Sequence, residues 1–426
     1  MKNVTRTSPS NSLRFRRVQN AATLVILAAA MLFAAGCGTV RIRHAVPKDF
    51  VNQAQVPGMS GIRCWGDSIQ KEIPDFVKAS VEQERKYLAS IGKEGQWPTA
   101  NFLAISGGGG DGAYAAGLLC GWTASGTRPE FKVVTGISTG ALIAPYAFLG
   151  PKYDSKVKEV YTTVTTASIM NPRYWLSILK ADSIADSKPL QDLAARHLTP
   201  EVLKEVAQEH AKGRRLLVGT TNLDAQRPVI WDLGAIASSG RPDALDLFRR
   251  ICVASASIPG VFSPAYITVE ANGKQYDEMH VDGGTSAQIF VYPPDLRIRE
   301  NAAKEGIQRE RKVYVIRTTR LQPEYAEVKA RVGAIAGRSV STLIKTQGIG
   351  DLYRIYFAAK RDGMEFNLDY LPEAFQAPRK DEFDQEFMTK LFDFGYQKGK
   401  AGIPWMKAPP GFESEAAKPE AAAKPK

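Results

Sequence analysis

The amino-acid sequence predicts an α/β fold with a mainly parallel central sheet and added helices. A short apolar run at residues 102–105 ends in glycines, a helix-like segment follows at 112–122, and a second apolar run occupies 131–134. This order describes two parallel strands joined through a helix by a right-handed crossover. The loops that follow the two strands therefore emerge at the same edge of the sheet and lie side by side.

Later segments continue this alternation of short apolar runs and helical patterns. The chain has 426 residues, of which 44% are hydrophobic and 23% charged, so it can bury one large core. The further predicted strands are 215–220, 228–231 and 313–317, and the further predicted helices are 73–91, 138–149, 242–256, a mainly helical stretch at 152–212 and a region around 325–360.

The N-terminal segment has the layout of a secretory signal peptide. Five basic residues precede an uncharged run at residues 21–35, which is too short to be a comfortable membrane span. The run ends in small residues followed by Cys37, an ending that resembles a bacterial lipobox. This resemblance implies that Cys37 is acylated and becomes the first mature residue. The alternative is an ordinary signal peptide or an uncleaved anchor, with Cys37 incidental.

The net charge and the residue after Cys37 indicate the expected cellular location of the protein. The formal net charge is +12, and basic surfaces favour anionic partners, of which phospholipid headgroups rather than nucleic acid are the nearest for an envelope protein. Gly38 resembles the sorting signal of Gram-negative lipoproteins for the outer membrane. We therefore expect a lipid-anchored protein of the bacterial cell envelope, facing the periplasm from the outer membrane rather than the inner one. A basic surface that is merely solvated is the alternative.

The remaining cysteines predict neither a metal site nor a fold built on disulfides. Cys64, Cys120 and Cys252 are odd in number and show no CxxC spacing or histidine cluster. Cys120 and Cys252 lie in apolar stretches that are typical of small core residues. The sequence leaves open whether Cys64 pairs.

The most informative segment is a GxSxG pattern formed by Gly136, Ser138 and Gly140. The pattern alone is a weak signal, but here it stands after a predicted strand and before a predicted helix. Glycines at both ends allow a sharp strand-to-helix turn that exposes the serine hydroxyl at the sheet edge. A serine that merely caps the helix is the alternative.

A glycine loop at residues 106–112 follows the first strand of the same unit. Gly107, Gly109 and Gly112 also read as GxGxxG, but no acidic residue ends the second strand, as a dinucleotide site requires, and no Gly-Lys-Ser/Thr follows, as a phosphate loop requires. Beside Ser138, the unobstructed N–H groups of this loop can donate to a developing oxyanion, helped by the positive end of the next helix. A plain tight turn is the alternative.

A general base for the serine is found by considering the scarce histidines. The chain has four, and none follows His280, which is the one candidate for a late histidine of a Ser-acid-His order. Asp282, by contrast, ends an extended run and precedes Gly283 and Gly284. Its carboxylate can accept the serine proton directly if partial desolvation raises its pKa or if proton transfer is concerted with attack. The alternative is a turn residue in an Asp-Gly-Gly bend.

Taken in order, the glycine loop, the GxSxG turn and the Asp-Gly-Gly turn resemble the patatin-like phospholipase family over residues 102–287. The resemblance implies a three-layer α/β/α fold and a Ser-Asp dyad in which Ser138 is the nucleophile and Asp282 the base. It further implies an oxyanion hole at Gly107, Gly108 and Gly109, with backbone support from Gly112, Gly136, Gly140, Gly283 and Gly284.

Asp111 departs from this resemblance because many family members carry Arg or Lys there. A carboxylate about 6 Å from the oxyanion would oppose it by roughly 3 kcal/mol at an effective dielectric near 20. We therefore expect Asp111 to point away from the site and to cap the helix that starts at Gly112.

These inferences divide the chain and define its expected activity. The predicted segments are a signal peptide at 1–36, a lipidated tether and packing segment at 37–98, a catalytic domain at 99–320, a C-terminal helical extension at 321–412 and a disordered tail at 413–426. The expected function is hydrolysis of phospholipid or lysophospholipid acyl esters through an acyl-enzyme, with no metal or cofactor. The alternatives are an esterase on non-phospholipid acyl esters and a non-catalytic envelope lipoprotein that keeps the fold as a binding module.

Overall fold

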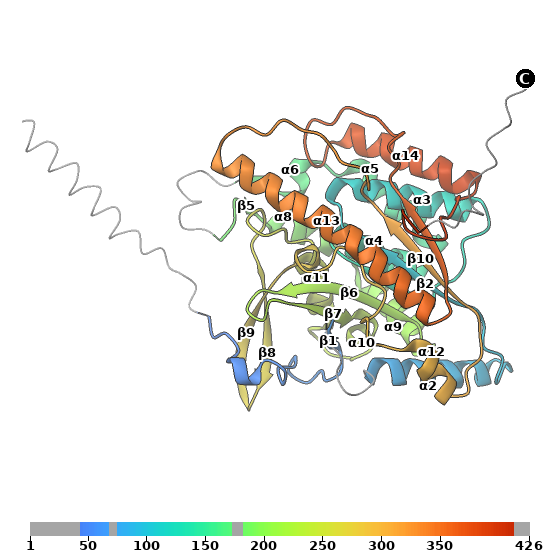
Figure 1. Ribbon diagram of the computed structural model, residues 1–426. Helices are drawn as coiled ribbons and strands as arrows, with labels where there is room; N and C mark the ends of the chain where they lie inside the picture. The colour runs from blue at the N-terminus through green and yellow to red at the C-terminus, as the bar shows by residue number, and fades with distance from the viewer. Residues whose placement is uncertain (1–42, 68–74, 173–181, 413–426) are drawn as a thin grey trace, which may run out of the picture.

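A computed structural model describes residues 43–67, 75–172 and 182–412 of the chain (Figure 1). The predicted signal peptide, Cys37, Gly38 and the predicted tail at 413–426 lie outside the described residues. Within the described ranges, no helix combines the length and the apolar composition needed to cross a bilayer.

Among the described residues, the centre of the molecule is a mostly parallel sheet of nine strands, which confirms the predicted α/β class. Five neighbouring strands run parallel, in the spatial order β6, β3, β2, β10, β11, and the others join antiparallel. The strands are β1 (Arg63–Trp65), β2 (Ala100–Ile105), β3 (Val133–Gly136), β6 (Arg215–Asn222), β7 (Arg227–Asp232), β8 (Ala265–Ala271), β9 (Lys274–Asp282), β10 (Arg311–Arg317) and β11 (Glu365–Tyr370); β4 (Asn171–Pro172) and β5 (Ala185–Asp186) form a separate pair.

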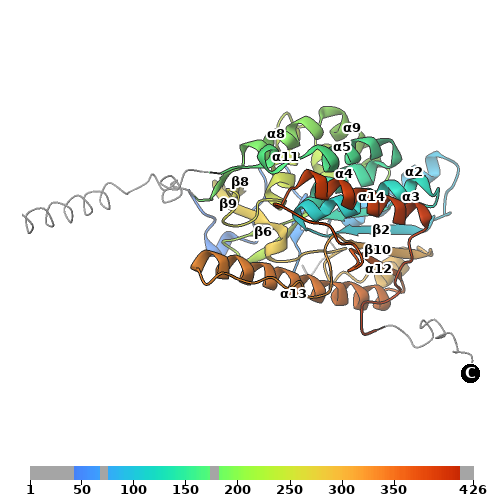
Figure 2. The same ribbon diagram turned by 90° about the horizontal axis from the view of Figure 1, so that it is seen from above.

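Helices cover both faces of the sheet and give a three-layer arrangement (Figure 2). One face carries a layer that includes α3, α4 and α14, and the long α13 runs along the other. The helices are α2 (Asp75–Ser90), α3 (Gly112–Ala124), α4 (Thr139–Leu149), α5 (Asp154–Thr163), α6 (Thr166–Ile169), α8 (Lys188–His197), α9 (Pro200–Ala211), α10 (Leu233–Ala237), α11 (Ala244–Ser255), α12 (Ile298–Lys304), α13 (Val332–Arg361) and α14 (Gln385–Ala401), with short 3₁₀ turns at Lys48–Phe50, Gly109–Asp111, Pro151–Tyr153 and Gly283–Thr285.

The predicted strand and helix that lead to the site are confirmed, but four strands of the central sheet, β1, β8, β9 and β11, are not among the predicted strands, although the end of β9 is predicted to be extended. The β8–β9 hairpin has no clear hydrophobic pattern, because polar and charged residues fill much of β9, whose side chains are partly exposed. β11 lies in the region expected to be helical, yet it pairs in parallel with β10 along its whole length. The region after residue 321 therefore contributes to the central sheet itself.

Reciprocal glycines let α3 and α14 pack unusually closely. Gly117 and Gly121 of α3 face α14, and Gly395 and Gly399 of α14 face α3. A Cβ at Gly117 would lie 2.0 Å from the carbonyl oxygen of Phe392, so only glycine fits there. Because α14 covers its outer side, α3 is buried continuously from Gly112 to Trp122.

We predict that Gly117→Ala lowers the free energy of unfolding by about 2–3 kcal/mol, because the added methyl group must push two helix backbones apart. The matched control is Gly337→Ala in α13, where an added Cβ meets nothing. That change should stabilise the protein by about 0.5–1 kcal/mol through helix propensity. Urea unfolding measures both, and equal effects of the two substitutions would contradict the close packing.

Candidate active site

The register of β6 explains why two distant loops meet. One edge of β6 pairs in parallel with β3 up to Gly136↔Val218, and β7 occupies the other edge. Beyond the end of β3, the first edge continues with β9, which runs the opposite way and pairs Thr220↔Asp282. The carboxyl ends of β3 and β9 therefore meet head-on beside β6. This arrangement brings Ser138 and Asp282 together.

Ser138 occupies a sharp turn between β3 and α4. Its backbone has φ 53° and ψ −122°, a conformation that side-chain-bearing residues rarely adopt. The turn is possible because a Cβ at Gly140 would lie 2.3 Å from the carbonyl oxygen of Ile105 and no side chain is there. The Ser138 N–H donates to Ser255 Oγ at 2.9 Å, and that hydroxyl donates to the carbonyl oxygen of Gly219 at 2.6 Å. The strained turn is thus tied to the neighbouring strand.

The Asp282 carboxyl is buried and bonded to Ser138. Burial raises its pKa to about 7, while hydrogen bonds from the Ser138 side chain and the Gly284 N–H act in the lowering direction. Gly284 donates to Oδ1 at 2.7 Å, and the Asp282 N–H donates to the carbonyl oxygen of Ser257 at 2.9 Å. The pKa of Asp282 is therefore raised, as expected for a carboxylate that takes up a serine proton near neutral pH.

The glycine loop lies against the same pair. A Cβ at Gly107 would lie 3.1 Å from Ser138 Cβ, so the loop passes directly over the serine. The Gly107 N–H donates to the carbonyl oxygen of Gln288 at 3.1 Å and is already engaged. In the described part of the chain, the N–H groups of Gly108 and Gly109 have no acceptor. Two of the three expected oxyanion donors are therefore free in this structure, and Gly107 instead anchors the loop.

The expectation that Asp111 caps α3 is wrong. Asp111 stands at the N-cap position, but its side chain makes no capping hydrogen bond. It pairs with Arg379, whose Nη1 lies 3.0 Å from Oδ1, and Arg379 also bonds to Glu382. Burial raises the pKa of Asp111, and Arg379 acts against that rise. A cation from the C-terminal region, rather than helix N–H groups, neutralises this carboxylate.

His280 takes no part in the dyad. It is fully buried, with Nε2 3.0 Å from Glu278 Oε2 and Nδ1 2.9 Å from Thr220 Oγ1, so both ring nitrogens are occupied. Glu278 in turn forms a buried ion pair with Arg63. The histidine is therefore part of a polar core network, and the Ser-acid-His alternative loses its one candidate.

Three residues that position the site are not predicted from the sequence. The Ser255 hydroxyl accepts the Ser138 N–H, the Gln288 carbonyl oxygen accepts the Gly107 N–H, and Arg379 pairs with Asp111. Ser255 lies in a run of small residues at 254–257, so the sequence does contain a local signal there. The other two act through tertiary contacts that leave no local pattern.

The described residues contain no group of three His, Cys, Asp or Glu side chains that could hold a metal ion. Cys64, Cys120 and Cys252 are buried free thiols. Burial raises the pKa of Cys64 and of Cys120 to about 12, so neither ionises near neutral pH.

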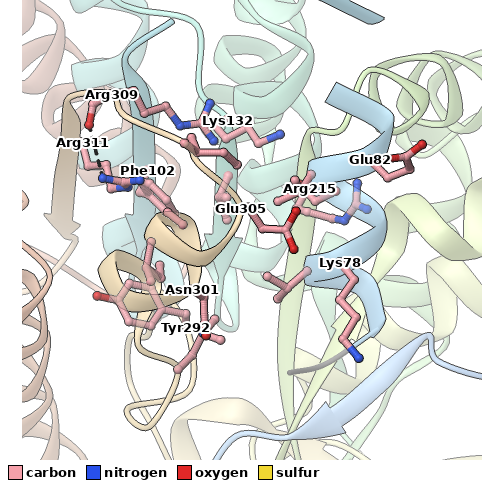
Figure 3. Close-up of a pocket in the computed structure, with 18 of the residues that line it drawn as sticks. Lys78, Glu82, Phe102, Lys132, Arg215, Tyr292, Asn301, Glu305, Arg309 and Arg311 are labelled. Carbon is pink, nitrogen blue, oxygen red and sulfur yellow. Dashed lines mark hydrogen bonds between the residues drawn. The ribbon is translucent and has the colours of Figure 1, made fainter. Parts of the chain in front are cut away.

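An apolar cavity of about 370 Å³ lies elsewhere, at the amino ends of β2, β3 and β6 (Figure 3). Its lining includes Phe102, Lys132 and Arg215, and no residue of the glycine loop or of the dyad belongs to it. The parallel strands carry Ser138 at their opposite, carboxyl ends. This cavity is therefore not part of the candidate active site.

Together, the three layers of the α/β/α fold bring Ser138, Asp282 and the glycine loop to one edge of the central sheet. Residues 103–294 match the family model described as patatin-like phospholipase. This part of the chain is a patatin-like phospholipase domain, from a family of lipid acyl hydrolases. Among solved structures, VipD from Legionella pneumophila is similar over 72% of this chain and 67% of its own, with 13% identity and a TM-score of 0.33. No curated protein sequence matches the chain.

We predict that Asp282→Asn stabilises the protein, and more so at pH 8 than at pH 5. A carboxyl whose pKa is raised on folding loses stability as pH rises from its unfolded value through about 7, and the amide does not titrate. A shift of about three pKa units corresponds to at most about 4 kcal/mol above neutral pH. Urea unfolding at the two pH values measures the difference. A loss of stability at pH 8 would show that the buried charge is compensated.

Proposed function

We propose that Ser138 and Asp282 form a catalytic dyad that hydrolyses phospholipid or lysophospholipid acyl esters through an acyl-enzyme. The observation that carries the proposal is the hydrogen bond between the serine side chain and a buried carboxyl with a pKa of about 7. A carboxylate with an unshifted pKa near 4 would be a weak base, whereas this one is matched to neutral pH.

The first half-reaction forms the acyl-enzyme. As Ser138 Oγ attacks the ester carbonyl, Asp282 accepts the hydroxyl proton, and the carbonyl oxygen becomes an oxyanion. The free N–H groups of Gly108 and Gly109 are available to donate to it. Collapse of the tetrahedral intermediate breaks the bond to the leaving alcohol, which takes the proton from Asp282 and departs.

The second half-reaction frees the serine. A water molecule gives a proton to Asp282 while its oxygen attacks the acyl carbon. Collapse breaks the bond to Ser138 Oγ, the proton returns to Oγ, and the fatty acid leaves. Asp282 thus acts as base and acid in both steps, which is why a pKa near the working pH is useful.

Arg379 makes the glycine loop compatible with this chemistry. Glu382 lies directly against the loop, since a Cβ at Gly109 would be 2.2 Å from its carboxylate. With Asp111, two acidic groups stand beside the proposed oxyanion hole, and Arg379 pairs with both. The guanidinium offsets charge that would otherwise oppose the developing oxyanion.

We predict that Ser138→Ala and Asp282→Asn each lower kcat/KM for a long-chain lysophospholipid at least 10³-fold, while the fold is kept. Wild-type kcat/KM should rise with pH and level off above about 7, because the base must be ionised. The matched controls are Ser239→Ala and Asp246→Asn, two exposed positions. A serine-reactive fluorophosphonate should label wild type and both controls but not Ser138→Ala. Absence of labelling, together with no hydrolysis of any ester, would instead favour the non-catalytic binding module.

We also infer that the enzyme works at a lipid surface, because the first half of α13 is exposed and apolar. Figures 1 and 2 show this half reaching the side of the molecule where β8 and β9 lie. Val332 is 87% exposed, Leu343 69%, Ile335 52% and Val340 48%. At 3.6 residues a turn these side chains fall within about 140° of the helix circumference. Such a stripe is typical of helices that lie in a membrane interface.

The opposite side of the same helix is fixed to the protein. Arg338 donates to the carbonyl oxygen of Glu324, and Lys345 pairs with the Glu324 carboxylate at 3.0 Å. The aliphatic side is therefore held outward. Exposed Lys329 and Arg331 precede it and favour an anionic lipid surface. This surface favours a lipid substrate over a soluble ester, and it fits the proposed envelope location and acyl anchor at Cys37.

The buried half of α13 joins this stripe to the site. Asp351 accepts the Gln288 N–H at 2.8 Å, and Gln288 in turn accepts the Gly107 N–H. A Cβ at Gly348 would touch the Gln288 side chain at 3.0 Å. A lipid surface bound at the stripe would therefore lie along the helix that supports the glycine loop.

We predict that the double change Val332→Asp and Leu343→Asp lowers binding to phosphatidylglycerol vesicles at least tenfold, because two charges must enter the interface. Cosedimentation of full-length protein carrying Ser138→Ala and Cys37→Ala measures binding without hydrolysis or an acyl anchor. In the active background, vesicle hydrolysis should fall while hydrolysis of a soluble short-chain ester stays unchanged. Ile91→Asp, at an exposed position just after α2, is the control and should bind normally. Undiminished vesicle binding by the double variant would refute the surface.

A further inference from the structure

The cavity at the amino ends of the strands is an apolar space that the core leaves unfilled. Its floor is formed by Phe102 of β2, Val133 of β3 and Leu217 of β6, which point to one face of the sheet. Its walls come from α2, with Val77 and Val81, and from α12 and the segment before it; the wall residues there include Val291, Tyr292, Leu296, Ile298 and Ala302.

The cavity separates two parts of the core. One cluster on this face contains Phe102 and Val291, and another contains Leu217, while Val133 touches both. Across the opening, Arg85 of α2 forms an ion pair at 3.2 Å with Glu305, which directly follows α12. The sheet therefore gives this space a hydrophobic floor.

Positive charge gathers at one end of this space. Figure 3 shows Lys132, Arg309 and Arg311 together at that end. Lys132 and Arg309 share one carboxylate, Glu84, each at 2.7 Å. The Arg311 guanidinium donates to the carbonyl oxygen of Arg309 at 3.2 Å and has no ion-pair partner among the described residues. Three cations thus face a single acid.

One buried donor at this end of the cavity lacks an acceptor among the described residues. Arg309 Nε is buried and has no hydrogen-bond partner within the described chain. Burial lowers the pKa of Lys132 to about 7, and burial and then Arg309 lower the pKa of Arg311. Asp362, which acts on Arg311 from a distance, is already bonded to Arg361 and Tyr292. An added carboxylate would neutralise this end at little cost in desolvation, because the cations are already partly removed from water.

We propose that this cavity binds one long-chain fatty acid, with the alkyl chain on the Phe102, Val133 and Leu217 floor and the carboxylate at Arg311, Arg309 and Lys132. A volume of about 370 Å³ suits one alkyl chain rather than a whole two-chain phospholipid, because it lies near the lower end of ligand-pocket sizes. The site is separate from the dyad and would exist even if the protein hydrolyses nothing.

The test is displacement of the fluorescent fatty acid cis-parinaric acid by hexadecanoate, measured on the full chain with Ser138→Ala so that no ester is turned over. Ala302→Trp fills the cavity from α12 and should weaken binding at least tenfold. The neighbouring Ala303→Trp points to solvent and should bind normally. Val81→Trp fills the cavity from α2 and should also weaken binding, which would show that the loss of binding does not come from a local distortion of α12. Thermal unfolding checks that all variants are folded.

The charged end has its own test. Arg311→Gln should weaken hexadecanoate binding about tenfold, whereas Lys78→Gln, at a cation on the rim outside the charged end, should change it little. Methyl hexadecanoate, which lacks the charge, should displace the probe poorly from wild type and be insensitive to Arg311→Gln. Binding that survives both tryptophan variants, or equal displacement by acid and methyl ester, would overturn the proposal.

Discussion

The candidate active site depends on one constraint of the sheet, which is that β3 and β9 compete for the same edge of β6. β3 stops at the level of Val218, and β9 arrives from the other direction at Thr220. Each strand must therefore turn away where the other ends, and each does so at glycines. The serine turn and the Asp-Gly-Gly turn both form where one strand would otherwise run into the other. The side chains of Ser138 and Asp282 meet there because the two backbones cannot occupy the same edge.

This geometry also sets the chemistry of the carboxyl group. Asp282 lies inside the sheet rather than at a solvated loop, so its charged form is costly and its pKa rises to about 7. Pairing of β9 with β8 over seven residues and with β6 over three holds the strand in place regardless of that cost. The strand pairing thus keeps a poorly solvated carboxyl beside a strained serine turn, and unfavourable local arrangements of this kind are typical of functional sites.

The sequence could predict what depends on local order along the chain, and little else. Gly136, Ser138 and Gly140 stand between a strand and a helix, and parallel topology then places them beside the glycine loop, so the core of the site could be inferred. The hydrogen bond between Gly107 and Gln288 and the ion pair between Asp111 and Arg379 could not be inferred. Their partners are 181 and 268 residues apart in the sequence, respectively, and neither contact leaves a repeating pattern. Asp111 is instructive: its place before a helix predicts a cap, but a nearby guanidinium offers it a stronger partner.

The region after the matched domain is part of the site rather than an appendage to it. α14 packs on the helix that follows the glycine loop, through backbone contacts that only glycine permits, and the segment leading into α14 brings Arg379 and Glu382 onto the loop itself. α13 supports Gln288 from the other face of the sheet. The glycine loop is therefore fixed between two C-terminal elements. An oxyanion hole works only if its donors need not reorganise as charge develops, and these elements would give the proposed hole that rigidity in an otherwise flexible run of glycines.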